Sequence, residues 1–341
     1  MAFNILIRDP DKRFVGDFEY LLEDTAFSLV QSDEQSWQDS AALEAQFGRR
    51  PPKIAVNFLS DNLQSLSEKQ LAELDALVAY CEKRKLPLIH LSHFRVFGES
   101  YQEKGWREGD LPEPEDAFGN LLLQMENRVA DLDQSIFLRP SWLLDGVHAG
   151  LLKRFLEPML AGEEVVVSDR HFGSPLSGRF IARAVFAMIQ QIMCGAENWG
   201  VFHLHSSDKC SEAEFADQLY RLLSNEFKLT VKSPNVVGVD DERYLVLGCA
   251  HLLGRRCTAN FGIQLPTWRS GFARVVKNWM DRSVHRDGVN NATEKSEAQK
   301  QQPESKSAGK KGLGNKGLHK KKPVNQPPEN TDEPGKKTKR A

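Results

Sequence analysis

Arg179 and Arg183 are two cations whose type and spacing could serve chemistry. They lie four residues apart, so in a helix they share one face, about one turn from each other. Guanidinium groups match phosphate oxygens in a fixed fork geometry, and the pair could therefore grip a diphosphate. A solvated helix face explains the same spacing, and the sequence leaves both interpretations open.

The sequence gives less support for a metal site or a catalytic nucleophile than for this cation pair. His203 and His205 alternate along an expected strand and so face opposite sides, and no carboxylate or cysteine converges on them, which favours structural histidines. The five cysteines are scattered and lack a Cys-x-x-Cys pair, so neither a disulfide framework nor a metal site is indicated. No P-loop, His-Glu-x-x-His or Gly-x-Ser-x-Gly motif occurs.

A Gly-x-Gly-x-x-Gly match, residues 312–317, lies near the C-terminus. No strand pattern precedes it and no amphipathic helix follows, so it lacks the context of a dinucleotide fingerprint. We interpret it as a chance match in a Gly/Lys-rich segment.

The elements that must position these side chains alternate between strand and helix patterns. Strands are expected at 3–7, 27–31, 53–59, 88–91 and 135–138, and helices at 14–22, 40–47, 67–85 and 116–130. Short connections between alternating elements are typical of a parallel sheet. The sequence therefore predicts an α/β fold with a Rossmann-type, doubly wound parallel sheet.

Composition indicates the general class of protein. The chain has 341 residues and is 40% hydrophobic, as in soluble globular proteins, and no apolar run approaches the ~20 residues of a membrane span. Its N-terminus is unlike a secretory signal, so we expect a cytoplasmic protein with no membrane partner.

The C-terminal segment differs from the rest in charge. Residues 301–341 carry 11 Lys/Arg and 4 Asp/Glu, whereas the first 300 carry 34 and 43. Few large apolar residues occur from about residue 289, which predicts a disordered tail. Its lysine clusters could attract nucleic acid, although a solubilising tail is the preferred interpretation.

Five segments resemble, in order and spacing, the dTDP-4-dehydrorhamnose reductase-like family, the sugar-nucleotide branch of the extended short-chain dehydrogenases/reductases. They are LIHLSHFRVFGE (88–99), FLRPSWLLD (137–145), VVVSDRHFGSPLSG (165–178), GVFHLHSSDKCSEAEFA (200–216) and ANFGIQLPTWRSGFARVV (259–276). The resemblance covers about residues 1–282. It implies a degenerate Rossmann-like domain (1–145), an interleaved substrate-binding region (146–282) and a Lys-rich tail (283–341).

The resemblance places Phe118 and Leu122 where the family has a tyrosine and a lysine, its proton donor and the cation that tunes it. Phenylalanine cannot donate a proton, and leucine cannot shift the pKa of a neighbouring donor. Of the five tyrosines, only Tyr80 has a cation four residues on, Arg84, and both lie within the expected helix 67–85. No substitute pair is apparent.

The expected phosphate-binding turn has also changed. The family has a Gly-rich turn here because glycine lets a backbone approach a pyrophosphate. This chain has RDPDKRFVG (8–16), where Gly16 is the only glycine of the first 47 residues and Asp9 and Asp11 add negative charge. An ordinary solvated turn is the favoured interpretation. We expect no cofactor, or NADP or NAD if the protein is an active reductase.

His93 falls on the family's catalytic threonine, with Ser92 beside it. His93 could donate a hydrogen bond or titrate near neutral pH, but no partner is visible, and a structural histidine is the alternative.

The segments that resemble the family's substrate-binding motifs differ less from the family pattern than the phosphate-binding turn and the proton-donor positions do. Trp142 could stack on a base or sugar, or could be a core aromatic, while Gly173 and Pro175 fit a structural turn as well as a ligand contact. The resemblance implies seven substrate-binding candidates: Arg139, Ser141, Trp142, Asp169, Gly173, Pro175 and Arg179.

Three functions remain open at this point. The leading hypothesis is a catalytically inactive, regulatory or scaffolding protein that binds a nucleotide sugar and has a protein partner. An active NAD(P)H-dependent reductase with a rebuilt acid is the first alternative. An interaction protein with a non-functional pocket is the second.

Overall fold

A computed structural model describes residues 3–33, 35–60, 68–98, 104–146, 148, 150–238 and 248–281. All of them lie within one compact unit, Met1–Asp287. The expected regions 1–145 and 146–282 share this unit, and the boundary between them stays a prediction. The expected tail lies outside the described residues.

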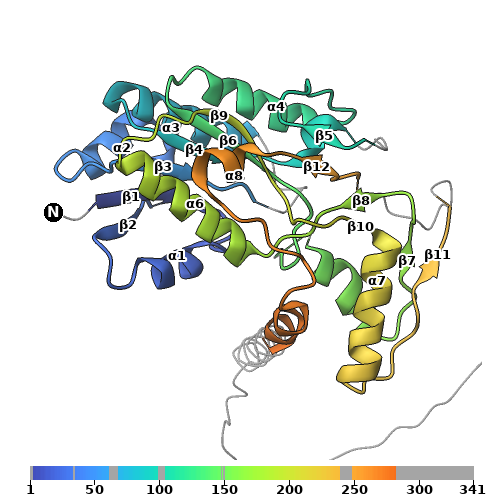
Figure 1. Ribbon diagram of the computed structural model, residues 1–341. Helices are drawn as coiled ribbons and strands as arrows, with labels where there is room; N and C mark the ends of the chain where they lie inside the picture. Colours follow the sequence, from blue (N-terminus) through green and yellow to red (C-terminus); the bar gives the residue numbers. More distant parts are fainter. Residues whose placement is uncertain are drawn as a thin grey trace, which may run out of the picture. The chain divides into compact units, whose positions relative to one another are not determined.

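A six-stranded, wholly parallel sheet forms the centre of the fold (Figure 1). Across the sheet the strands are β2 (Phe27–Gln31), β1 (Phe3–Arg8), β3 (Ile54–Asn57), β4 (Leu88–Leu91), β6 (Ser135–Pro140) and β9 (Gly200–Leu204). The chain runs from β1 outward to β2 and then crosses to β3 on the other side of β1. The switch point of this doubly wound sheet therefore lies between β1 and β3, at the carboxyl edge.

Helices cover both faces of the sheet, which explains why β3, β4 and β6 are buried along their whole length. Residues of α1 (Val15–Leu22), α6 (Gly178–Met193) and α8 (Arg256–Phe261) share one apolar cluster with the sheet. Residues of α2 (Ser40–Phe47), α3 (Glu68–Arg84) and α4 (Ala117–Ala130) share the cluster on the opposite face. These elements confirm the predicted fold class.

Capping side chains fix where the important helices begin. Asp116 accepts a hydrogen bond from the amide of Gly119 at the start of α4, and Ser177 accepts one from Phe180 at the start of α6. From its cap, α4 carries Phe118, Leu122 and Glu126 four residues apart along one side.

A third apolar cluster organises the C-terminal half of the chain. Its helical elements include α5 (Glu157–Leu160), α7 (Glu212–Arg221) and the π-helical turns η3 (Leu152–Leu156) and η4 (Leu222–Glu226), and Leu122 of α4 also belongs to it. Short strand pairs join β10 (Cys210–Ser211) to β8 (Phe172–Gly173), β11 (Asn235–Val236) to β7 (Val166–Val167), and β12 (Leu252–Leu253) to β5 (Trp106–Arg107). The 3₁₀ turns η1 (Ser36–Gln38) and η2 (Phe94–Phe97) and a helix over 272–281 complete the described elements. No helix among the described residues has the length and apolarity needed to cross a bilayer.

Candidate functional site

The positions expected to hold catalytic groups lie together where β4 meets α4. The rings of His93 and Phe118 meet edge to face with centroids 5.7 Å apart, and the Arg95 guanidinium lies 5.8 Å from the Phe118 ring. Leu122, one turn further along α4, is fully buried in the apolar cluster of the C-terminal half. Phe118 and Leu122 are therefore packing residues.

His93 is held as a neutral imidazole. Its ring stacks on Phe94 with centroids 4.3 Å apart, and its Nδ1 accepts a hydrogen bond from the backbone amide of Arg95 at 3.2 Å. Burial, and then the positive charge of Arg95, lower the pKa of His93 to about 3. Near neutral pH the ring therefore carries no imidazolium proton that it could donate as a general acid.

Ser92 and Arg139 meet at a buried carboxylate. Arg139 donates from Nε and Nη2 to the two oxygens of Glu126 at 2.9 and 2.6 Å, and the Ser92 hydroxyl donates to the same carboxylate. Arg139 is 2% exposed and Glu126 5% exposed. Arg139 therefore forms an internal ion pair with Glu126 of α4, and its expected substrate contact stays a prediction.

A second buried polar chain crosses the carboxyl ends of β1, β3 and β4. Arg8 pairs with Glu73 of α3 and donates to Asn57 Oδ1 at 3.1 Å, while Asn57 Nδ2 lies 2.9 Å from His90 Nδ1. Burial lowers the pKa of His90 to about 4. Arg8, Asn57 and His90 are register partners, so they share one face of the sheet. The sequence analysis missed this chain, although each strand has a polar residue at its last or second-last position.

The turn between β1 and α1 is closed by its own carboxylate. Asp9 Oδ2 accepts hydrogen bonds from the amides of Phe14 at 2.6 Å and Val15 at 3.1 Å, at the start of α1. Burial raises the pKa of Asp9. The Phe14 ring stacks on Phe58 at 4.1 Å. The expectation of an ordinary solvated turn is therefore wrong, because Asp9 bonds inward and Phe14 packs into the core.

Ser141 joins the sheet to the C-terminal half. Its hydroxyl donates to the carbonyl of Ala250 at 2.6 Å and accepts from the amide of Ser174 at 2.8 Å. Both bonds are buried, so the hydroxyl uses its donor and one acceptor lone pair in tertiary structure.

Trp142 takes the core position that the sequence left open. It is 1% exposed, and its Nε1 donates to the carbonyl of Gly248 at 3.1 Å. A Cβ on Gly173 would lie 2.2 Å from the Trp142 ring, so Gly173 is required by this packing. Asp169 is exposed in the turn between β7 and β8.

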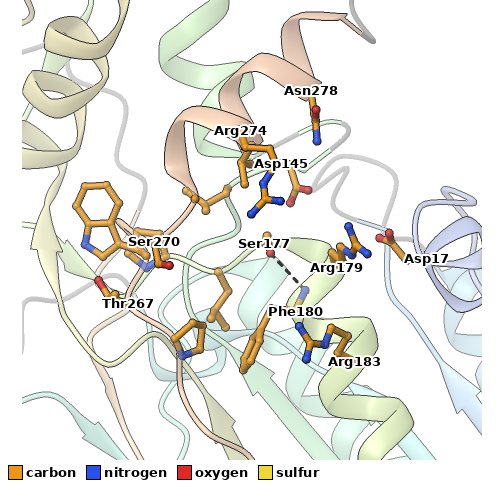
Figure 2. Close-up of a pocket in the computed structure, with 17 residues that line it drawn as sticks. Asp17, Asp145, Ser177, Arg179, Phe180, Arg183, Thr267, Ser270, Arg274 and Asn278 are labelled. Carbon is orange, nitrogen blue, oxygen red and sulfur yellow. Dashed lines mark hydrogen bonds between the residues drawn. The ribbon is translucent and has the colours of Figure 1, made fainter. Parts of the chain in front are cut away.

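Two cavities lie on either side of an ion pair. A narrow cavity of about 70 Å³ is lined by Ser92, His93, Ser141, Trp142 and Arg13, among others. A wider pocket of about 460 Å³ lies at the start of α6 (Figure 2). Arg13 of the narrow cavity pairs at 3.0 Å with Asp145, which lines the wide pocket. Binding sites for organic ligands usually enclose about 300–1,000 Å³, which only the wide pocket of these two reaches.

Two of the seven expected substrate residues line the wide pocket. Pro175 and Arg179 do so together with Arg183 and Arg274, the last of these missed by the sequence analysis. A cation near residue 274 could be read from the sequence, but no spacing relates it to α6. Among the described residues, no group of His, Cys, Asp and Glu could hold a metal ion.

Comparisons with known proteins agree with this architecture. A dTDP-4-dehydrorhamnose reductase from Clostridium acetobutylicum is 20% identical, with 82% of this chain and 99% of that chain covered at a TM-score of 0.66. The reductase of Bacillus anthracis in complex with NADP is 17% identical (80% and 97% covered, TM-score 0.62). The Bordetella bronchiseptica enzyme WbmG, in complex with NAD and UDP, is 15% identical (83% and 96% covered, TM-score 0.64).

None of the curated proteins matches the chain. The family described as the RmlD substrate binding domain matches residues 64–280, which is more than half of the sequence. This match includes the ends of β4 and β6, α4 and all residues of the wide pocket except Asp17, and it agrees with the resemblance read from the motifs. The chain belongs to the RmlD substrate binding domain family.

Proposed function

We propose that this protein binds a nucleotide sugar and does not reduce it. The observation that carries the proposal is the packing of Phe118 and Leu122. Phe118 meets the His93 ring, and Leu122 is 0% exposed in the core. Loss of a general acid alone costs about 10²- to 10⁴-fold in rate. A protein that binds a nucleotide sugar without converting it would have a regulatory or scaffolding role and a protein partner.

The proposal extends to the nicotinamide cofactor. In related folds a pyrophosphate lies at the amide groups that begin the first helix. Here the carboxylate of Asp9 is hydrogen-bonded to those amides, from Phe14 and Val15. A dinucleotide would have to displace a bonded anion of the protein, and the residues present therefore do not fit its phosphates. We derive no reaction step through such a cofactor.

An active reductase is the competing function, and one observation favours it. The neighbours from B. anthracis and B. bronchiseptica are in complex with NADP and NAD. Such an enzyme would need a rebuilt acid, and His93 is the residue that the sequence offers. Its lowered pKa argues against that role, since a group with a pKa of about 3 carries no proton to donate as an imidazolium near pH 7.

Three measurements on the purified protein separate these functions. Fluorescence titration with NADPH and NADH should show no saturable binding, and tight binding would contradict the blocked phosphate position. Thermal shift with dTDP- and UDP-sugars should show stabilisation, whereas no shift with any of them would favour an interaction protein without a working pocket. Turnover of dTDP-4-dehydrorhamnose that is lost in His93→Ala would establish the active reductase.

A further inference from the structure

The wide pocket gathers three arginines from two separate helices. Arg179 and Arg183 come from α6, and Arg274 comes from the helix over 272–281 (Figure 2). All three are exposed. Within the described part of the chain, neither Arg183 nor Arg274 forms an ion pair, and Arg179 lies 5.1 Å from the Tyr20 ring. Three cations thus surround one hollow with little internal neutralisation.

The start of α6 does not by itself account for the site. Its first amides already have acceptors: Gly178 donates to Asp145 Oδ1 at 2.8 Å, and Phe180 donates to Ser177 Oγ at 3.3 Å. An anion in the pocket would therefore be held by guanidinium side chains. Two guanidinium groups at one-turn spacing and a third from across the pocket suit an anion with several oxygens on adjacent phosphorus atoms.

The carboxylates of the lining do not cancel this charge. Asp145 is neutralised by Arg13 at 3.0 Å, which leaves Asp17 as the other acidic residue of the lining. The remaining wall includes Leu144, Phe180 and Pro266, which could pack against an organic group. The pocket of about 460 Å³ has room for more than inorganic phosphate.

We propose that the wide pocket binds the diphosphate of a nucleoside diphosphate sugar through Arg179, Arg183 and Arg274. This inference rests on the proposed function and assigns it a place. The site lies across the Arg13–Asp145 pair from the narrow cavity, which Ser92 and His93 line. The proposed ligand site is thereby distinct from positions 93, 118 and 122, where the family's catalytic side chains are replaced.

The test is isothermal titration of the full-length protein with inorganic pyrophosphate, UDP and a UDP-sugar. Arg183→Gln and Arg274→Gln should each weaken binding about tenfold, since loss of one charged hydrogen-bonding partner commonly has an effect of this size. Lys277→Gln is the matched control, because Lys277 is an exposed cation of the same helix as Arg274 that does not line the pocket. Thermal unfolding confirms that each variant is folded.

The outcomes distinguish the site from the function. Binding of pyrophosphate and UDP-sugar that falls in both arginine variants and not in Lys277→Gln supports the inference. Nucleotide-sugar binding that both variants retain would overturn it and leave the proposed function standing. Arginine-dependent pyrophosphate binding without nucleotide-sugar binding would support the diphosphate site and overturn the proposed function. Failure of all three ligands to bind would overturn both.

Discussion

The carboxylate of Asp9 offers the sharpest test of how the β1–α1 turn is built. It accepts two backbone hydrogen bonds, from Phe14 and Val15, and burial raises its pKa above the ordinary 3.8. Two substitutions separate these features. Asp9→Ala removes both acceptors and the charge, whereas Asp9→Asn removes the charge and keeps one acceptor oxygen.

The sizes follow from the geometry. Loss of a side-chain acceptor at a helix start costs about 0.5–2 kcal/mol, and Asp9 serves two amides, so Asp9→Ala should lose about 1–2 kcal/mol of unfolding free energy. Asp9→Asn should lose less at pH 7, because removal of a desolvated charge offsets part of the weaker bonding.

The pH dependence has a definite sign. A carboxyl whose folded pKa is raised binds its proton more tightly in the folded state, so its contribution is fully present below pH 3.8 and declines as pH rises through the folded pKa. The stability of Asp9→Asn relative to wild type should therefore increase from about pH 4 upward.

Urea unfolding of the three proteins from about pH 4 to pH 8 measures these differences, with m-values compared to confirm the same transition. The reasoning would be refuted if Asp9→Ala were as stable as wild type at pH 7. It would equally fail if wild type gained stability over Asp9→Asn as the pH rose.

Three further substitutions probe the positions around α4 and the sheet edge, each measured by urea unfolding. Glu126→Ala should cost about 3–5 kcal/mol, because it leaves the guanidinium of Arg139 buried and unpaired. Gly173→Ala should cost about 1–3 kcal/mol, because the new Cβ would lie 2.2 Å from the Trp142 ring. Leu122→Lys should cost several kcal/mol, about the penalty for a buried ammonium, because residue 122 is 0% exposed.

The substitutions at Gly173 and Glu126 each have a control in the same fold. Gly16→Ala lies in α1 with nothing within 4 Å of the new Cβ and should be neutral or slightly stabilising. Glu126→Gln keeps an acceptor for Arg139 and should cost less than Glu126→Ala. Equal losses for Gln and Ala at position 126 would contradict the ion-pair argument, and a stable Leu122→Lys variant would contradict full burial of that site.

The sequence predicted the sheet well because its strands carry a strong local signal. The strands at 27–31 and 88–91 and the helix at 40–47 were predicted with the boundaries that the structure has, since apolar runs and turn residues bracket them. The short pairs such as β8 with β10 could not be predicted, because a two-residue strand has no periodicity and is set by tertiary contacts.

Candidate residues were harder to place than elements. Trp142 and Arg139 both fall at a strand end, where a ligand contact and a core contact give the same sequence pattern. Their roles depend on Gly248 and Glu126, which are distant in sequence or lie on another element. The inward orientation of the Asp9 side chain was also not predicted, because its charge alone indicated a solvent-exposed position.

The partners of the strand-end polar groups explain why a ligand site would lie at α6. In open α/β sheets ligands bind outside the carboxyl edge because unpaired groups converge there. Here Arg8 pairs with Glu73, Arg139 pairs with Glu126, and Asp9 takes the first amides of α1. Each pairing engages a charged group or a backbone donor of this edge with another part of the protein. The arginines of the wide pocket have no such partners among the described carboxylates, which is why we place the proposed anion site there.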